Sequence, residues 1–327
     1  DDIILENKRN SIGLKIRRVI NTLTNISLGK IAPEIDVDFI ISPIISLLPF
    51  HMRKPYIVTI HDFQQKYYPE FFTLRERVSR SILYKTGKKA NMVICESNYV
   101  KKDIIRFLRV PEERIRVIQS PPPKYIRETK LDDSKLEIVK EKYELSDKFI
   151  FYPAQFWYHK NHINLIKSIY LIRGRYKEDM VLVLAGSKKD NFENVMREIQ
   201  SLNLSKQVKY IGYVPDEDMP YLYRLSTALV MPTLFESVSM PIWEAFHLGC
   251  PVVSSNVCAL PEQVGDAGLL FDPYNIGDIA EKIYKIWTNE ALRKELIQKG
   301  YDRVKNLTLE NYAKKWENII EEVVLKI

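Results

Sequence analysis

The sequence predicts an α/β protein made of two doubly wound, Rossmann-like units. From residue 37 onward, short β-branched runs alternate with longer amphipathic stretches, which is typical of parallel sheets covered by helices. The alternation stops at the proline run 121–123 and starts again at Phe149, after a charged stretch. We therefore expect one domain over residues 1–145 and a second over residues 146–327, with a hinge between them.

The individual elements follow from hydrophobic periodicity. In the first domain we expect a helical stretch at 11–28, strands at 37–41, 56–60, 92–95 and 116–118, and helices at 74–86 and 98–108. A charged connecting helix is expected over 128–148. In the second domain we expect strands at 149–152, 181–185, 208–211, 228–231 and 252–254, each followed by a helical stretch. Apolar residues recur at helical spacing over 309–324 and predict a final helix with one buried stripe.

Composition narrows the class of protein. With 327 residues and 46% hydrophobic content, the chain is long and apolar enough for two cores. Its three cysteines, Cys95, Cys250 and Cys258, lack close metal-ligand spacing and favour a reducing compartment, so we expect the cytoplasm. The most apolar stretch, 37–50, is too short to span a bilayer. The chain starts at Asp1 without a signal-peptide pattern, and we expect a fragment or a trimmed protein.

Positive charge is concentrated in the first half of the chain. Residues 1–150 hold 28 Lys/Arg against 20 Asp/Glu, whereas the remainder holds 21 against 22. The densest cluster comprises Arg75, Arg77, Arg80, Lys85, Lys88, Lys89, Lys101, Lys102, Arg106 and Arg109. Such a cluster is either a patch that attracts anionic lipid headgroups or phosphorylated acceptors, or a solvated helical face. Both interpretations stay open at this point.

Two glutamates eight residues apart, Glu236 and Glu244, are the most informative feature for function. Glu236 is expected in a loop, and Glu244 about one turn inside a helix that Pro241 can open, so that both face one cleft. A helix N-terminus offers free amides to a phosphate. A carboxylate beside it can accept hydrogen bonds from two neighbouring sugar hydroxyls. The combination favours a nucleotide sugar, although glutamates at this spacing also occur often by chance.

The wider sequence around this pair resembles the donor-site signature of retaining glycosyltransferases of family 4. The matching residues are Met231-Pro232, Phe235-Glu236, Met240-Pro241, Glu244-Ala245, Gly249-Cys250-Pro251-Val252-Val253 and Leu260-Pro261-Glu262. The resemblance extends from about Tyr56 to the C-terminus. It implies the GT-B fold, in which an acceptor-side domain and a donor-binding domain face each other across a cleft and the C-terminal helix packs back toward the first domain. It also implies that Glu244 holds the ribose hydroxyls and that Glu236 contacts the transferred sugar.

Two further residues resemble catalytic positions of the family. Lys160 follows the first strand of the second domain and resembles the lysine that binds the diphosphate, where its charge would stabilise the leaving group. The family often has an arginine five residues earlier, but this chain has Gln155, so stabilisation rests more on Lys160 and on backbone amides. His61 follows a strand of the first domain and resembles the histidine that faces the bound sugar; a packing role is the alternative. Asp62 is either an orienting group or a loop cap, and Ser97 is either a cleft contact or a helix cap.

The other expected donor contacts lie at strand ends and at one helix start. Gly186 follows the strand 181–185, Tyr213 and Val214 follow Gly212 near the expected nucleobase site, and Ser239 and Met240 begin the helix of Glu244. An ordinary strand turn is the alternative at 210–214. The family's usual first strand and glycine-rich loop are not found before 11–28, so the first domain is expected to lack them.

Together these features predict a cytoplasmic, mannosyltransferase-like enzyme that acts with retention and without a metal or cofactor. Its partners are expected to be a GDP- or UDP-linked sugar and a glycan or lipid-linked acceptor for surface polysaccharide synthesis, with no nucleic acid. Peripheral attachment to the inner face of the membrane depends on how the basic cluster is read. Two alternatives stay open: a GT-B nucleotide-sugar epimerase, and a non-catalytic nucleotide-sugar-binding or assembly protein, which Gln155 favours.

Overall fold

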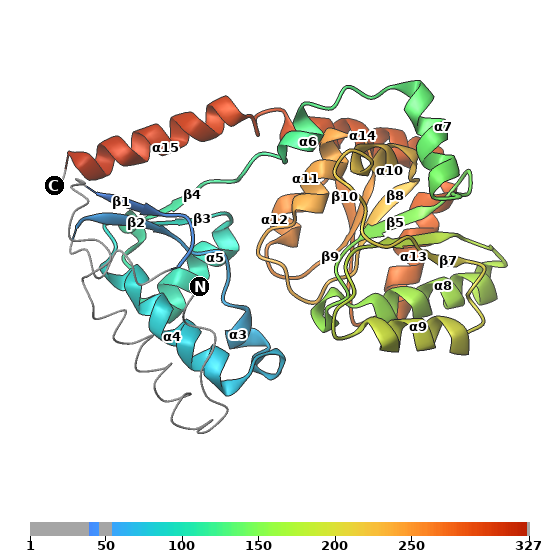
Figure 1. Ribbon diagram of the computed structural model, residues 1–327, viewed down its shortest axis with the longest axis horizontal. Coiled ribbons are helices and arrows are strands. Elements are labelled where there is room, and N and C mark those ends of the chain that lie inside the picture. The colour runs from blue at the N-terminus through green and yellow to red at the C-terminus, as the bar shows by residue number, and fades with distance from the viewer. Residues whose placement is uncertain (1–38, 46–53, 326–327) are drawn as a thin grey trace, which may run out of the picture.

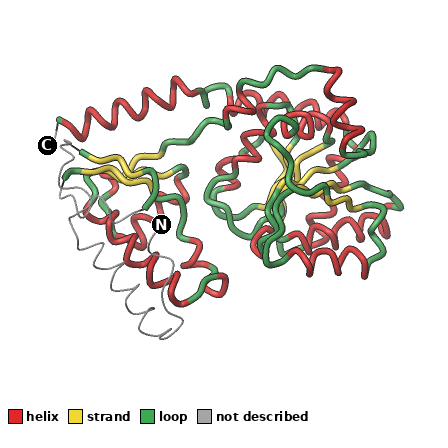
Figure 2. Tube along the Cα trace, viewed as in Figure 1, coloured by secondary structure: helices red, strands yellow, loops and turns green. Residues whose placement is uncertain are grey.

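The computed structural model describes residues 39–45 and 54–325, and these form two parallel sheets with helices around each (Figure 1). Figure 2 shows the strands as two separate groups, one in each half of the molecule. The expected helical stretch at 11–28 and the first two residues of the expected strand 37–41 lie outside the described residues.

Within the described ranges, the first sheet contains four parallel strands in chain order: β1 (Ile40–Ser42), β2 (Tyr56–Thr59), β3 (Met92–Cys95) and β4 (Ile115–Val117). Its strands alternate between two cores. Tyr56, Val58 and Val93 pack with residues of α4 (Leu74–Lys89) and α5 (Asn98–Asp103), whereas Ile57 and Ile94 face the opposite side. The expected helix 98–108 is α5 continued by a π-helical turn, Ile104–Leu108. The described part of this half also contains short helical turns at α3 (Gln64–Tyr67), Pro69–Phe71 and Glu112–Arg114.

The connection between the sheets is less helical than expected. Pro123 precedes a single turn, α6 (Lys124–Arg127), which the sequence did not predict, and α7 spans only Asp133–Lys142. Asp132 caps α7 by accepting a hydrogen bond from the Ser134 amide. The helix ends at Lys142 with Tyr143 as its C-cap, just before Glu144 takes a positive φ of 44°. The predicted helix over 128–148 was therefore wrong in extent, because these local signals start and stop α7 inside that range.

The second sheet contains six parallel strands in the order β10-β9-β8-β5-β6-β7. They are β5 (Ile150–Pro153), β6 (Leu182–Ala185), β7 (Val208–Tyr210), β8 (Ala228–Met231), β9 (Val252–Ser255) and β10 (Gly268–Phe271). Five of them were predicted. The sixth, β10, was missed because its sequence, Gly-Leu-Leu-Phe, holds no β-branched residue.

Helices cover both faces of this sheet (Figure 1). They are α8 (His162–Tyr176), α9 (Phe192–Ser201), α10 (Met219–Leu225), α11 (Met240–His247), α12 (Leu260–Val264), α13 (Ile276–Thr288) and α14 (Glu290–Val304). The four central strands, β5, β6, β8 and β9, are buried, whereas the edge strands β7 and β10 are only partly buried.

The strand order places a topological switch point at β5. This strand lies between β6 and β8, so the chain leaves β5 toward one edge of the sheet and β8 toward the other. In open parallel sheets, ligands bind in the crevice at such a point, beyond the carboxyl ends of the strands. The segments after β5 and β8 are therefore the place to look for a site.

The final helix, α15 (Leu309–Val324), returns to the first sheet, as Figure 1 shows. Ile319 and Val323 pack against Ile57 and Ile94, and Arg116 of β4 forms an ion pair with Glu322 at 2.7 Å. The expected C-terminal helix that packs back on the first domain is thus confirmed. Among the residues that the structure describes, no helix is both long and apolar enough to cross a membrane.

Candidate active site

Lys160 and Glu236 form an ion pair at the switch point. Lys160 lies in a short 3₁₀ turn, Tyr158–Lys160, after β5, and Glu236 lies in the segment after β8. The Lys160 Nζ donates to Glu236 Oε2 at 2.6 Å, and the two side chains are 18% and 17% exposed. The structure therefore brings together two of the three residues that the sequence placed in catalysis. Both side chains keep a small exposure to solvent.

The backbone around Lys160 is held by buried polar contacts. Tyr152 of β5 donates its hydroxyl to the Lys160 carbonyl at 2.7 Å. Asn161 takes a left-handed conformation, with φ 57°, and its side-chain amide donates to the Pro232 carbonyl at 2.9 Å. Sequence reasoning missed both supports. An Asn between a strand end and a helix is a usable signal, because Asn adopts this conformation at little cost.

Glu244 is buried inside α11 and already has two partners. Its Oε2 accepts a hydrogen bond from Tyr223 at 2.6 Å and its Oε1 accepts one from Tyr125 of α6 at 2.8 Å. Burial raises the pKa of the Glu244 carboxyl above its usual range, and the two hydroxyls offset only part of that effect. Each oxygen keeps a second lone pair for an incoming hydroxyl. The sequence did not indicate either tyrosine, since both lie far from Glu244 along the chain.

Four of the expected donor contacts line one pocket. Gln155, Gly186, Tyr213 and Val214 surround it together with Tyr125. Gly186 is required there, because its φ is +132° and a Cβ atom would lie 2.4 Å from the Ala154 carbonyl oxygen. The Gln155 side chain is exposed and accepts a hydrogen bond from the Trp157 indole at 2.9 Å.

Ser239 and Met240 lie at the start of α11, directly after the segment of Glu236. The helix begins at Met240 with Pro241 as its second residue, one position later than expected for the proline. The Ser239 amide donates to the Gln263 side chain at 2.8 Å, which also donates back to the Ser239 carbonyl. The Ser239 hydroxyl is buried and has no hydrogen-bond partner among the residues that the structure describes.

His61 lies where the four strands of the first sheet end. Its Nδ1 donates to Glu96 at 3.0 Å and its Nε2 donates to the Pro43 carbonyl at 3.0 Å. The hydrogen bond to Glu96 raises the pKa of His61. Although burial opposes it, the hydrogen bonds from His61 and Ser120 hold the pKa of Glu96 below its usual value. The arrangement favours a charged imidazolium, held within the first domain rather than against Lys160 or Glu236.

The structure shows the contacts of Asp62 and Ser97, for each of which the sequence left two roles open. Asp62 accepts a hydrogen bond from the Gln64 amide at 2.9 Å, which is the loop-cap arrangement. Ser97 does both things expected of it: it caps α5 by accepting from the Val100 amide and donates to the Ser237 carbonyl at 2.9 Å. This second contact joins the two domains one residue away from Glu236.

The described part of the chain contains no group of three or more His, Cys, Asp or Glu residues placed to hold a metal ion. Independence from metals and cofactors stays a prediction.

The fold and the site define a glycosyltransferase of the GT-B type. Residues 133–303 match the family described as "Glycosyl transferases group 1", and residues 13–121 match the one described as "Glycosyltransferase Family 4". Because the first match covers more than half of the sequence, the chain belongs to the group 1 glycosyltransferases.

Individual proteins agree with this family. O-antigen chain mannosyltransferase B of Escherichia coli is 28% identical over 267 residues, which cover 81% of this chain and 69% of that protein. The serotype-specific mannosyltransferase WbdA of Escherichia coli is 28% identical over 211 residues, which cover 64% of this chain but only 26% of that protein. The fold is shared with Anabaena Alr3699/HepE, solved in complex with UDP and glucose, at a TM-score of 0.75, 17% identity, and coverage of 96% of this chain and 83% of that one.

Proposed function

We propose that this glycosyltransferase moves a hexose, with mannose as the first candidate, from a nucleotide diphosphate to a glycan or lipid-linked glycan of a surface polysaccharide. The observation that supports the proposal most is the Lys160–Glu236 pair at the switch point, followed in the chain by α11 with its buried Glu244. The similarity to two proteins named mannosyltransferases supports the choice of sugar. HepE, solved with UDP and glucose, supports a nucleotide-linked donor.

Each residue has a distinct role in this proposal. The diphosphate lies near the start of α11, where Lys160 turns from Glu236 toward the leaving group as the glycosidic bond breaks. Glu236 contacts the transferred sugar, and Glu244 accepts hydrogen bonds from the ribose. The acceptor oxygen bonds to the anomeric carbon on the face that the phosphate leaves, and the departing phosphate oxygen takes the acceptor's proton. The anomeric configuration is thereby retained.

Product analysis after a donor screen tests the reaction. We expect one of GDP-mannose, UDP-glucose or a related nucleotide sugar to raise the melting temperature of the full chain. That donor should then release its nucleoside diphosphate and glycosylate a glycan acceptor. Stabilisation without release would instead indicate the binding protein that Gln155 leaves open, and a donor sugar inverted at a ring carbon would indicate an epimerase.

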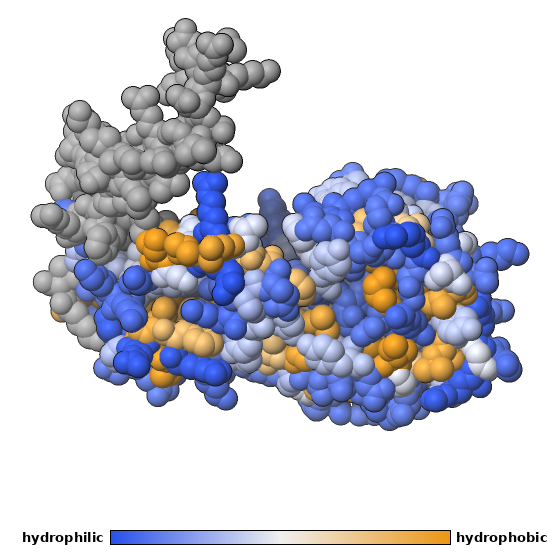
Figure 3. Space-filling model, turned by 90° about the horizontal axis from the view of Figure 1, so that it is seen from below, coloured by the Kyte–Doolittle hydropathy of each residue, from blue (hydrophilic) through white to orange (hydrophobic). Residues whose placement is uncertain are grey.

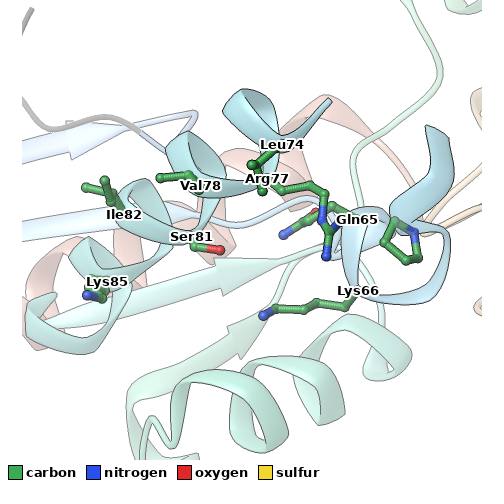
Figure 4. A pocket seen from close by; sticks show the side chains of 9 residues that line it. Gln65, Lys66, Leu74, Arg77, Val78, Ser81, Ile82 and Lys85 are labelled. Carbon is green, nitrogen blue, oxygen red and sulfur yellow. The ribbon is translucent and has the colours of Figure 1, made fainter. Parts of the chain in front are cut away.

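We further propose that α4 attaches the enzyme to an anionic membrane surface. Leu74, Val78 and Ile82 follow one another at helical spacing and are 73%, 51% and 42% exposed. In Figure 4 they lie along one side of α4, beside a pocket lined also by the cations Lys66, Arg77 and Lys85. Figure 3 shows apolar surface flanked by hydrophilic surface on this half of the molecule. Apolar and basic side chains on one face suit a lipid interface.

Not every cation of the basic cluster in the sequence is available to the proposed membrane-binding face of α4. Arg80 lies over the Phe72 ring and 3.5 Å from Asp62, and Lys101 forms an ion pair with Glu112. By contrast, Lys66, Arg77 and Lys85 have no acidic partner among the described residues.

Neutralising Lys66, Arg77 and Lys85 to glutamine should weaken binding to vesicles that contain phosphatidylglycerol by about 100-fold, since each cation near such a surface contributes about 1 kcal/mol. Sedimentation at low and high salt measures this, because screening should remove the same contribution. As a control, Lys206, Lys314 and Lys315 are three exposed lysines on other elements, and their replacement should change little. Equal losses in both triple variants, or binding insensitive to salt, would show that α4 is only a solvated face.

A further inference from the structure

A second cleft lies between the domains, beside the Lys160–Glu236 pair. It encloses about 610 Å³ and is lined from the first domain by Glu70, Phe71, Phe72 and Arg80, and from the second by Trp157, Tyr158, His159 and Asp190. This volume is in the range of ligand-binding pockets, which occur preferentially at domain interfaces. None of these residues belongs to the donor pocket described above.

Three aromatic rings form a row that crosses from one domain to the other. Tyr68 stacks on Phe71 with ring centroids 5.3 Å apart, and Phe71 faces Tyr158 at 6.4 Å with an interplanar angle of 15°. Phe71 and Tyr158 are nevertheless 37% and 47% exposed. Aromatic side chains that stay partly exposed inside a cleft are suited to a ligand with an apolar face of its own.

Two carboxylates of the cleft can accept hydrogen bonds from ligand hydroxyls. The carboxylates of Glu70 and Asp190 have no hydrogen-bond or ion-pair partner among the described residues, and each can accept several hydrogen bonds. A pyranose ring has both features that this cleft would recognise: a face of C–H groups for the aromatic rings and hydroxyls at its edge for the carboxylates.

The residues that line the cleft neighbour those of the candidate active site in both domains. The Tyr68 hydroxyl donates to the Leu234 carbonyl at 3.0 Å, two residues before Glu236, and Tyr158 lies two residues before Lys160. On the first domain, Arg80 lies 3.5 Å from Asp62, which follows His61. A sugar held on the aromatic row would therefore border the residues proposed to act on the donor.

We propose that this cleft is an acceptor subsite that binds a pyranose unit of the acceptor glycan, with the exposed parts of Phe71 and Tyr158 contacting its C–H face and Glu70 and Asp190 accepting hydrogen bonds from its hydroxyls. The inference rests on the proposed glycosyl transfer and names where its acceptor binds.

Glycoside binding to the full chain tests the subsite without any need for turnover. The probes are methyl α-D-mannopyranoside and methyl α-D-glucopyranoside, titrated by saturation-transfer NMR. Tyr158→Ala and Phe71→Ala should each raise the dissociation constant about tenfold, whereas Tyr158→Phe, which keeps the ring, should not. Tyr170→Ala is the matched control, because Tyr170 of α8 has the same exposure of 47% outside the cleft.

The outcomes separate this inference from the proposed function. Failure of both glycosides to bind the parent chain, or equal affinities for Tyr158→Ala and Tyr170→Ala, would overturn the subsite. A chain that transfers sugar with the same acceptor KM in Tyr158→Ala as in the parent would overturn it too, while leaving the transferase proposal intact. A chain that binds the glycosides through Tyr158 but consumes no nucleotide sugar would contradict the proposed function alone.

Discussion

Lys160→Ala should lower kcat by about 100- to 1,000-fold, which is the effect of removing one preorganised electrostatic group from a reaction that builds up negative charge. The ammonium pairs with Glu236. In the proposed mechanism it finds its strongest partner only when the diphosphate leaves. Nucleotide affinity should therefore change much less than turnover. Steady-state kinetics at saturating donor, together with calorimetry of GDP and UDP binding, separates the two effects.

A lower kcat in Lys160→Ala could have a second cause, since this substitution also leaves Glu236 without its cation. Combining Lys160→Ala with Glu236→Gln removes both charges and shows whether the loss comes from an unpaired carboxylate. Lys209→Ala is the control for removing a paired lysine, because Lys209 forms a 2.8 Å ion pair with Glu144 away from the crevice. Unchanged kcat in Lys160→Ala would exclude this residue from the chemical step.

Much of the fold could be predicted because strands and helices leave local periodic patterns. β2, β3, β8 and α15 lie within one residue of their expected ranges, since each is a compact run of apolar or regularly spaced residues. β10 was missed because it is a short apolar run without β-branched residues. The extent of α7 depended on capping by Asp132, which is a local signal that the charged composition of 128–148 concealed.

The candidate site was predictable in its residue types but not in its contacts. Strand ends and the glutamate pair pointed to Lys160, His61 and Glu236. That Lys160 meets Glu236 depends on β5 pairing with β8, and no local pattern specifies that pairing. The Tyr125–Glu244 contact joins the linker to α11 across 119 positions of sequence. Contacts of this kind arise from tertiary packing, which a single sequence does not display.

Glu244→Ala should lower the affinity for GDP or UDP by about 1.5–3 kcal/mol, because the ribose hydroxyls lose a charged acceptor. The structure adds a second effect that the sequence did not indicate. The Tyr223 side chain is fully buried and donates its hydroxyl to Glu244. Without this acceptor, the buried Tyr223 hydroxyl should lower the free energy of unfolding of Glu244→Ala by about 1–3 kcal/mol. Calorimetry and urea denaturation measure the two losses separately.

A double variant tells the two effects apart. Glu244→Ala with Tyr223→Phe removes the orphaned hydroxyl together with its former partner, so the free energy of unfolding should recover in part. Nucleotide affinity should stay as low as in Glu244→Ala, because the carboxylate proposed to bind the ribose is still absent. Recovery of both quantities would mean that Glu244 acts on the nucleotide only by ordering the core around α11. Unchanged nucleotide affinity in a folded Glu244→Ala protein would show that Glu244 does not bind the ribose.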